Sequence, residues 1–269
     1  MILKNGIPKK TKIKAGVFQF DIVPGDLKSN VKRAFLGIEA LCRAGTDIIV
    51  LPELWSCGFD IPNMAVHAGK TPGILSRLKA VSEKHHVFIG GSLPEKKDGM
   101  LYNTFFLIGP DGQLVCAYRK IHLFAPMCEN ECFSPGDRLT CCETSIGKIG
   151  LATCYDLRFP EVFRSLALKD ARLILVSAHW PHARIMHWEI LLRARAIENQ
   201  VFIMGVNACG AGKSPEFSGH SCIIAPEGEI LASAGTKPGY AAAMIDLDTV
   251  ERVRKRFSSL YERIPEAYD

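Results

Sequence analysis

The sequence predicts an α/β sandwich, in which helices cover two β-sheets. Short apolar runs typical of strands alternate, throughout the 269 residues, with segments whose apolar residues recur at helical spacing. Strand-like runs outnumber long helical segments, and no internal repeat, low-complexity stretch or linker interrupts the pattern. We therefore expect one domain over residues 12–257, followed by a C-terminal arm or tail over residues 258–269.

The N-terminal half is predicted to alternate strands with helices. Asp47–Leu51 is a short apolar run, as expected of a strand that is buried on both faces. Ser29–Arg43 carries apolar residues at helical spacing, and a second helix is expected from Thr71 to about His85, because Pro72 suits a first helical turn. The other predicted strands are Lys12–Phe20, Val87–Ser92, Asn103–Gly109 and Leu114–Arg119, the last two joined by a turn at Pro110-Asp111-Gly112.

The C-terminal half begins with a predicted long loop over residues 120–137. A strand pair, Leu139–Glu143 with Lys148–Thr153, is expected to turn at Ile146-Gly147. The remaining predictions are the helices Pro160–Lys169, Ala183–Asn199 and Asp248–Phe257, and the strands Arg172–Ser177, Val201–Asn207, Gly219–Ala225, Glu229–Ala234 and Ala241–Asp246.

Composition and charge narrow the possible functions. Hydrophobic residues make up 48% of the chain and charged residues 23%, an ordinary globular balance. The net charge of +5 comes from Lys and Arg residues spread along the chain, so nucleic-acid binding is not expected. The first residues do not have the pattern of a signal peptide, and no apolar segment of about 18 residues is present. We expect a cytoplasmic protein that does not enter a membrane.

The ten cysteines are expected to be mostly reduced, because a chain of this size without a signal peptide needs no disulfide framework. Cys42, Cys116, Cys209 and Cys222 lie in apolar runs and are predicted to pack as small hydrophobic side chains. A metal site is a competing interpretation, although its cysteine spacing is poor for zinc. Its ligands would be Cys128, Cys132, Cys141 and Cys142, with His122 close by.

Three reactive side chains each follow a predicted core strand. Cys154 comes after an apolar strand, at a turn before a helix, where a nucleophile and backbone amides for an oxyanion can be presented. Glu53 follows four apolar residues and a proline, and desolvation there raises a carboxyl pKa toward the range of a general base. Lys120 ends another strand, where an ammonium can stabilise an oxyanion and lower a thiol pKa.

Each of these residues also has an ordinary interpretation: a buried structural cysteine, a surface or capping glutamate, and a solvated lysine. The combination is more specific than its members, because parallel strands bring their carboxyl ends to one rim of a sheet. We expect the three side chains to converge at such a rim.

The motifs around these residues resemble those of the nitrilase (carbon–nitrogen hydrolase) superfamily, whose triad is Glu–Lys–Cys in that chain order. The three blocks are Leu51-Pro-Glu53, Tyr118-Arg-Lys120-Ile-His-Leu-Phe and Cys154-Tyr-Asp-Leu-Arg-Phe-Pro-Glu161. The resemblance runs from about residue 12 to 246 and also includes Tyr102-Asn-Thr104, Phe133-Ser-Pro-Gly136, Arg193-Ala-Arg-Ala-Ile-Glu-Asn199 and Gly219-His220-Ser221.

The resemblance implies a four-layer α-β-β-α sandwich that dimerises into an eight-layer assembly. We place the helices Pro160–Lys169 and Ala183–Asn199 at that interface. No metal or organic cofactor is implied.

The resemblance also assigns catalytic roles. Glu53 accepts the Cys154 proton, or stabilises a thiolate that Lys120 already favours. The sulfur then attacks an amide carbonyl. The backbone N–H of Tyr155 and the Lys120 ammonium hold the tetrahedral oxyanion, which breaks down to a thioester. The family's second glutamate maps onto Glu129, from its spacing to Lys120, and Glu131 is its rival.

Within the superfamily, the cysteine block resembles amidase branches, since true nitrilases usually carry Cys-Trp-Glu. The short segment between Phe124 and Glu129 resembles bacterial ω-amidases, which release ammonia from 2-oxoglutaramate and similar ω-amides. A deaminated-glutathione amidase and an N-carbamoyl amine amidohydrolase are the alternatives. A non-catalytic binding or scaffold protein is a different class, and it would predict degraded triad positions, yet all three are present.

A carboxylate-bearing substrate needs cationic or polar partners, for which Arg158, Arg184 and His179 are candidates. For Arg158, an ion pair with Glu161 is an equally good interpretation. Aromatic residues just past predicted strand ends serve either as pocket walls or as core; they are Phe124 and Trp180.

Overall fold

The structure is a computed structural model that describes residues 10–210 and 216–267. The start of the sequence, on which the absence of a signal peptide was judged, therefore lies outside the described residues, as do the last two residues of the predicted C-terminal arm. Within the described part, no helix is both long and apolar enough to cross a membrane.

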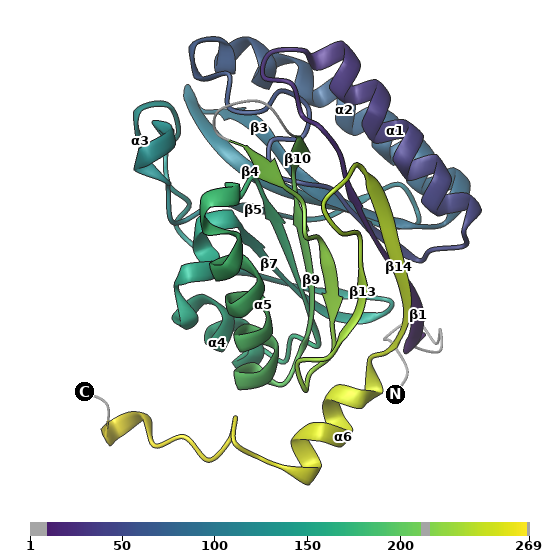
Figure 1. Ribbon diagram of the computed structural model, residues 1–269, viewed down its shortest axis with the longest axis vertical. Coiled ribbons are helices and arrows are strands. Elements are labelled where there is room, and N and C mark those ends of the chain that lie inside the picture. Colours follow the sequence, from purple (N-terminus) through teal and green to yellow (C-terminus); the bar gives the residue numbers. More distant parts are fainter. Residues whose placement is uncertain (1–9, 211–215, 268–269) are drawn as a thin grey trace.

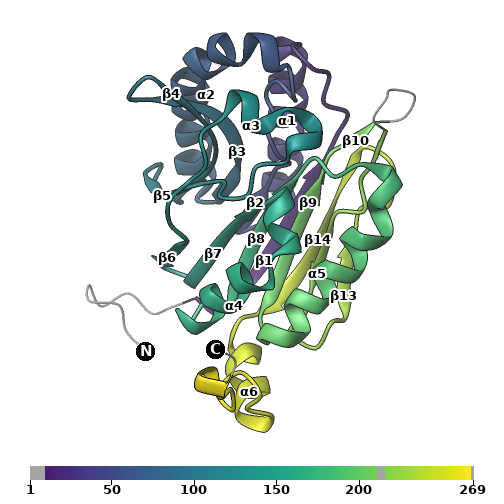
Figure 2. The same cartoon turned by 90° about the vertical axis from the view of Figure 1, so that its left-hand side faces the viewer.

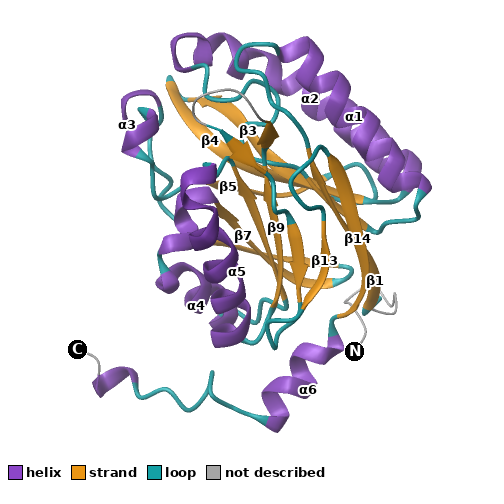
Figure 3. Ribbon diagram, viewed as in Figure 1, coloured by secondary structure: helices purple, strands orange, loops and turns teal. Residues whose placement is uncertain are grey.

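Two mixed β-sheets, each of six strands in the described residues, pack against each other and are covered by helices on their outer faces (Figures 1 and 3). Helices α1 (Leu27–Arg43) and α2 (Met64–His85) cover one sheet. Helices α4 (Pro160–Leu168) and α5 (Ile185–Asn199) cover the other. This arrangement confirms the α-β-β-α sandwich expected for a single chain.

The first sheet has the strand order β14-β1-β2-β3-β4-β5, and the second has β13-β12-β9-β8-β7-β6. A short hairpin, β10 with β11, was not predicted; most predicted elements are present with ends shifted by a few residues. The strands are β1 (Lys12–Gln19), β2 (Ile48–Val50), β3 (Phe88–Lys97), β4 (Met100–Ile108), β5 (Leu114–Arg119), β6 (Thr140–Thr144), β7 (Gly147–Thr153), β8 (Leu173–Ala178), β9 (Phe202–Asn207), β10 (Cys209–Gly210), β11 (Phe217–Ser218), β12 (Cys222–Ile224), β13 (Ile230–Ser233) and β14 (Gly239–Asp246).

Central strands are apolar on both faces because each face packs against a different layer. In β8, Leu173 and Leu175 join the core between the two sheets. The alternate residues Ile174 and Val176 pack under α4 and α5. All four side chains are fully buried, which accounts for the continuous apolar run in the sequence.

Helix α2 begins at Met64, so the predicted start at Thr71 is wrong, and Pro72 lies inside the helix. A proline removes one hydrogen bond from a helix interior. Tertiary contacts hold the extra turns before it: His67 pairs with Asp60 at 2.7 Å, and the Thr71 hydroxyl donates to the carbonyl of Pro94 at 2.6 Å. The pattern of one segment does not contain these contacts.

Strands β3 and β4 are longer than predicted because they form one continuous hairpin. Lys97 pairs with Met100 across a two-residue turn at Asp98 and Gly99, both with positive φ. Asp-Gly is a favoured sequence for such a turn, and it was the signal that the prediction overlooked.

The two sheets are joined covalently. Cys116 on β5 and Cys142 on β6 form a disulfide, with a Cα–Cα distance of 6.3 Å. The prediction that Cys116 packs as a reduced hydrophobic side chain is therefore wrong. The pairing depends on the approach of edge strands from two different sheets, which no local sequence pattern reveals.

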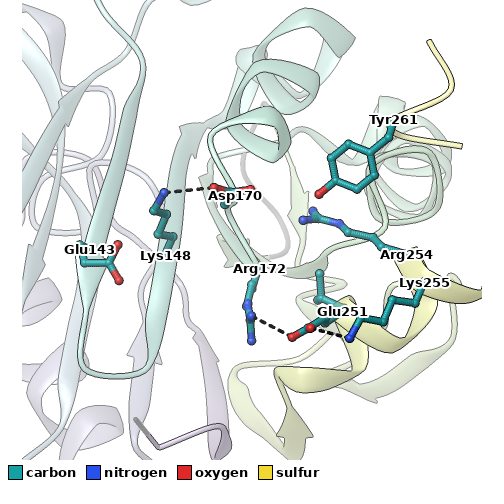
Figure 4. A pocket seen from close by; sticks show the side chains of 9 residues that line it. Glu143, Lys148, Asp170, Arg172, Glu251, Arg254, Lys255 and Tyr261 are labelled. Atoms are coloured by element: carbon teal, nitrogen blue, oxygen red, sulfur yellow. Dashed lines mark hydrogen bonds and ion pairs between the residues drawn. The ribbon is translucent and has the colours of Figure 1, made fainter. Parts of the chain in front are cut away.

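A solvent-facing pocket of about 460 Å³ lies beside the start of β8 and helix α6 (Asp248–Arg256) (Figure 4). Helix α6 lies at the opposite end of the fold from the short helix α3 (Glu129–Cys132) (Figures 1 and 2). We call this the charged pocket; it is lined by Glu143, Lys148, Asp170, Arg172, Val250, Glu251, Arg254, Lys255 and Tyr261.

Candidate active site

The three predicted catalytic residues come from both sheets, so the expectation of one sheet rim is wrong. Glu53 follows β2 and Lys120 follows β5 in the first sheet, whereas Cys154 follows β7 in the second. Hydrogen bonds tie the carboxyl ends of the two sheets together. The Ser177 hydroxyl donates to the carbonyl of Leu51 at 2.9 Å, and the Glu53 N–H donates to the carbonyl of Ala178, the last residue of β8, at 3.2 Å.

The Lys120 ammonium lies between two carboxylates. Its Nζ is 2.8 Å from Glu53 Oε1 and 2.5 Å from Glu129 Oε2, and all three side chains are fully buried. We call these three residues the buried charge cluster. The rival Glu131 is exposed on the outer side of α3, so the structure brings Glu129, and not Glu131, to the lysine.

Asn103 on β4 holds the two glutamates together, and sequence reasoning missed this function. Its Nδ2 donates to Glu53 Oε1 and to Glu129 Oε1, each at 2.8 Å, and its Oδ1 accepts from the hydroxyl of Ser92 at 2.7 Å. The only signal in the sequence was the Tyr102-Asn-Thr104 block, which was noted as part of a resemblance and given no role.

A close backbone approach explains the glycine of the Phe133-Ser-Pro-Gly136 block. Gly136 N–H donates to the carbonyl of Lys120 at 2.8 Å, which fixes the backbone of the lysine. A Cβ at this position would lie 2.1 Å from the carbonyl oxygen of Arg119. Only glycine allows this contact.

Cys154 begins a short 3₁₀ helix (Cys154–Arg158) directly after β7 and adopts a left-handed φ of 47°. Such a conformation is uncommon for a residue with a Cβ, and it is found preferentially at functional turns. The residue is 6% exposed, and both the Glu53 carboxylate and the Lys120 ammonium influence the pKa of its thiol.

Burial dominates the electrostatics of the site. It raises the pKa of the Glu53 carboxyl, against the opposing effect of Lys120. Burial alone would lower the pKa of the Lys120 ammonium, but the Glu129 and Glu53 carboxylates outweigh it and raise the pKa instead. Burial and Glu53 together hold the pKa of the Cys154 thiol well above its ordinary value. Lys120 lowers this thiol pKa, as expected, but burial and Glu53 have the larger effects, which favours the thiol over the thiolate as the resting form.

A narrow pocket opens beside the sulfur, with a free volume of about 10 Å³, room for about one water molecule. Two arginines lie over its aromatic walls: Arg158 is 4.8 Å from the ring centre of Trp180, and Arg184 is 5.8 Å from that of Phe124. We call it the cysteine pocket; it is lined by Phe124, Cys154, Tyr155, Arg158, His179, Trp180, Pro181 and Arg184.

His179 lines this pocket as a neutral group. Burial lowers the pKa of its imidazole to about 4, so it is not the cationic partner that was considered. The ring packs between Phe59 and Phe217, and its Nδ1 has no hydrogen-bond partner among the described residues. The backbone N–H of His179 donates to Glu53 Oε2 at 3.0 Å.

Arg158 does not form the ion pair with Glu161 that was one of its two interpretations. Within the described residues, its guanidinium contacts His187 Nδ1 at 3.3 Å and the ring of Trp180, while Glu161 is exposed on α4. Arg158 therefore has a half-buried cation at the wall of the cysteine pocket, and no carboxylate among residues 10–210 and 216–267 forms an ion pair with it.

The cysteines of the competing metal interpretation do not converge. Cys142 is in the disulfide, and Cys128 is exposed at the start of α3, on a different element from Cys141. In the part of the chain that is described, no three His, Cys, Asp or Glu side chains form a metal-binding group.

Comparisons with known proteins agree with this geometry. The family model of carbon-nitrogen hydrolases matches residues 14–255. The 2-oxoglutaramate amidase of Bacillus subtilis is 40% identical over 88% of this chain and 92% of its own length. The human omega-amidase NIT2 is 32% identical over 96% and 97%, respectively. The crystal structure of a carbon-nitrogen hydrolase from Helicobacter pylori superposes with a TM-score of 0.89 at 27% identity, covering 96% of this chain and 97% of that one.

Proposed function

The chain belongs to the carbon–nitrogen hydrolase family, and we propose that it releases ammonia from a small amide that carries a carboxylate, such as 2-oxoglutaramate or another ω-amide. The observation that carries this proposal is a fully buried lysine held between two carboxylates, whose charges, with burial, set the raised pKa of the Cys154 thiol. Relatives named 2-oxoglutaramate amidase and omega-amidase support the substrate class.

Glu53 is the general base in this proposal. Its raised pKa suits it to take the proton of Cys154, whose thiol does not ionise on its own at neutral pH. The proton moves to Glu53 as the sulfur bonds to the amide carbon, so charge does not accumulate on the buried sulfur. The amide carbonyl becomes a tetrahedral oxyanion in the same step.

The Lys120 ammonium and the backbone N–H of Tyr155 stabilise the oxyanion. Losing one such donor typically costs about 2.7–4 kcal/mol of transition-state stabilisation. Glu53 then gives its proton to the departing nitrogen; the C–N bond breaks, ammonia leaves, and a thioester on Cys154 remains. Water, deprotonated by Glu53 with Glu129 nearby, adds to the thioester, and collapse regenerates the thiol and a carboxylic acid.

Arg158 and Arg184 supply the positive charge for the substrate carboxylate. Both line the cysteine pocket, and His179, being neutral, contributes only a polar edge there. Free volume for about one water molecule does not admit a dicarboxylic amide. The pocket therefore has to widen when substrate binds, and the two arginine side chains, which lie against Trp180 and Phe124, are the groups we expect to move.

Ammonia release from a panel of compounds tests the proposal: 2-oxoglutaramate, succinamate, deaminated glutathione, a carbamoyl amine and a nitrile. We expect the highest kcat/KM with one of the two ω-amides and no turnover with the nitrile. Cys154→Ala should remove turnover and keep the circular dichroism spectrum of the folded protein. Full activity in that variant would refute the assignment of the nucleophile.

The panel also separates the alternatives. Preference for deaminated glutathione or for the carbamoyl amine would move the chain to those branches. No turnover of any compound, together with alkylation of Cys154 by iodoacetamide no faster than of the other free thiols, would favour a non-catalytic role.

A homodimer through α4 and α5 is a second part of the proposal. The outer faces of these helices expose apolar side chains that the sheets do not cover, and such patches mark association surfaces. A mass of two chains in light scattering, reduced to one by Ile190→Asp, is the expected result. The exposed side chains are Leu168, Met186, Ile190 and Ile197.

A further inference from the structure

Asp156 is a fully buried carboxylate two residues after the proposed nucleophile, and the mechanism above gives it no role. Both of its oxygens are occupied. Oδ2 accepts from the backbone N–H of Thr153 at 2.9 Å and from the hydroxyl of Tyr118 at 2.8 Å. Oδ1 accepts from the backbone N–H of His122 at 3.2 Å and lies 2.8 Å from the Nδ1 of the same residue.

These partners belong to the two segments that present the reacting groups. Thr153 immediately precedes Cys154 at the end of the second sheet. Tyr118 and His122 lie two residues before and two residues after Lys120, at the end of the first sheet. One carboxylate therefore connects the sulfur-bearing turn to both sides of the lysine.

The connection is rigid on each side. Tyr118 is fully buried, and its oxygen also accepts from the N–H of Ile121 at 3.3 Å. The ring of His122 stacks on Phe159, at the end of the 3₁₀ helix, with a centroid distance of 3.6 Å and an interplanar angle of 10°. A second contact thus joins the same two segments on the far side of Asp156.

We propose that Asp156 is a positioning residue that holds the Lys120 ammonium in register with the Cys154 sulfur. The lysine and the cysteine reach the site from different sheets, so no continuous strand or shared hydrogen-bond ladder sets their separation. The Asp156 carboxylate, which accepts hydrogen bonds from the lysine segment and from the cysteine segment, sets this separation. The inference rests on the proposed function, because it concerns the distance between two groups of that mechanism.

Asp156→Asn tests the inference, because the amide nitrogen cannot accept a hydrogen bond and so cannot replace one of the two carboxylate oxygens. We expect kcat to fall about 10²-fold, as when reacting groups are misplaced by about 1 Å, with KM changed by less than about 3-fold. Tyr118→Phe should lower kcat in the same way but less. If Asp156 acts through its link to the lysine segment, the double variant should be no slower than Asp156→Asn alone.

Thr71→Val is the matched control, since it also removes a buried hydrogen bond between elements, from α2 to β3, away from the site. It should lower the thermal midpoint and leave kcat unchanged. All rates are measured well below the midpoint of each variant. A purely structural Asp156 would lower the midpoint with kcat intact, or give independent effects in the double variant, and either result overturns the inference.

Cys154→Ala, assayed alongside, separates this inference from the proposed function. An active Cys154→Ala protein would end the proposed mechanism. An inactive one, with Asp156→Asn at the wild-type kcat, would end only the positioning role.

Discussion

Two sets of paired charges lie at opposite ends of the fold (Figure 1). The buried charge cluster follows the carboxyl ends of the sheets, whereas the charged pocket surrounds the start of β8 and helix α6 (Figure 4). Each contains a lysine beside a glutamate at nearly the same distance: Lys120 and Glu53 are 2.8 Å apart, and Lys255 and Glu251 are 2.9 Å apart.

The pKa values of the two glutamates nevertheless shift in opposite directions. Hydrogen bonding to Lys255 lowers the pKa of Glu251, as for a surface ion pair. Burial raises the pKa of Glu53, even though a lysine is equally close. The side chains of Lys255 and Glu251 are 74% and 51% exposed, and those of Lys120 and Glu53 are not exposed at all. Desolvation, and not the presence of a partner, decides the direction in which the pKa of each glutamate shifts.

Removing one lysine from each region gives the largest contrast. Lys120→Met should lower kcat/KM by about 10³-fold and destabilise the protein by about 3–5 kcal/mol, because two buried carboxylates lose their cation. Lys148→Met, which removes the lysine paired with Asp170 at 3.3 Å in the charged pocket, should cost less than about 1 kcal/mol and leave activity unchanged.

The two lysine variants should also differ in their response to pH. Without Lys120, the folded state holds a proton on Glu53 at pH values where the unfolded chain has released it, because burial raises the pKa of this carboxyl. Stability then falls as pH rises through the raised pKa of Glu53, so the loss of stability should be larger at pH 8 than at pH 5. Urea unfolding at both pH values measures this loss. Equal losses would mean that the Glu53 carboxyl is not desolvated.

Asn103→Leu should have the next largest effect. It removes both donors to the glutamates, which we expect to cost about 3 kcal/mol for two charge-assisted hydrogen bonds and to lower kcat at least about 10-fold. Asn30→Leu is the control, because Asn30 is equally buried, and its side chain's hydrogen-bond partners among the described residues are the backbone of Val23 and Ser56 and the side chain of Arg33, not the two glutamates. Asn30→Leu should lower stability and preserve kcat. If both variants lost kcat, Asn103 would have no specific role in holding the glutamates.

The pH–rate profile should show a smaller effect. Glu53 must be ionised to act as a base, so kcat/KM should fall on acidification with a midpoint above 4.5, the ordinary value for a glutamate. Glu251→Gln should leave this profile unchanged. A midpoint at or below 4.5 in the wild-type protein would contradict the assigned environment of Glu53.

The smallest expected effect is that of Lys255→Ala. The side chains of this pair are more than half exposed, so we expect a change in thermal midpoint close to experimental error, and less in high salt. A salt-insensitive loss of stability would show that the charged pocket is more than a surface ion-pair network.

Much of this protein was determined by local sequence. The apolar runs of β2 and β8 predicted strands buried on both faces, and Glu53, Lys120 and Cys154 lie just after strands, as predicted. The resemblance to the nitrilase superfamily mapped a second glutamate onto Glu129 rather than Glu131, from its spacing to Lys120 and to Pro135-Gly136, and the structure brings Glu129 to the lysine. These features depend on side-chain type and on distance along the chain, which a sequence contains directly.

Tertiary structure alone decided the rest. The disulfide between Cys116 and Cys142, the origin of the site in two sheets, and the contacts of Asn103 and Asp156 all join residues that are far apart in the chain. The direction of the Cys154 pKa shift was also decided by tertiary structure, because it depends on burial and on the charges of Glu53 and Lys120 together. Desolvation and long-range pairing are properties of the packed molecule, so no local pattern encodes them.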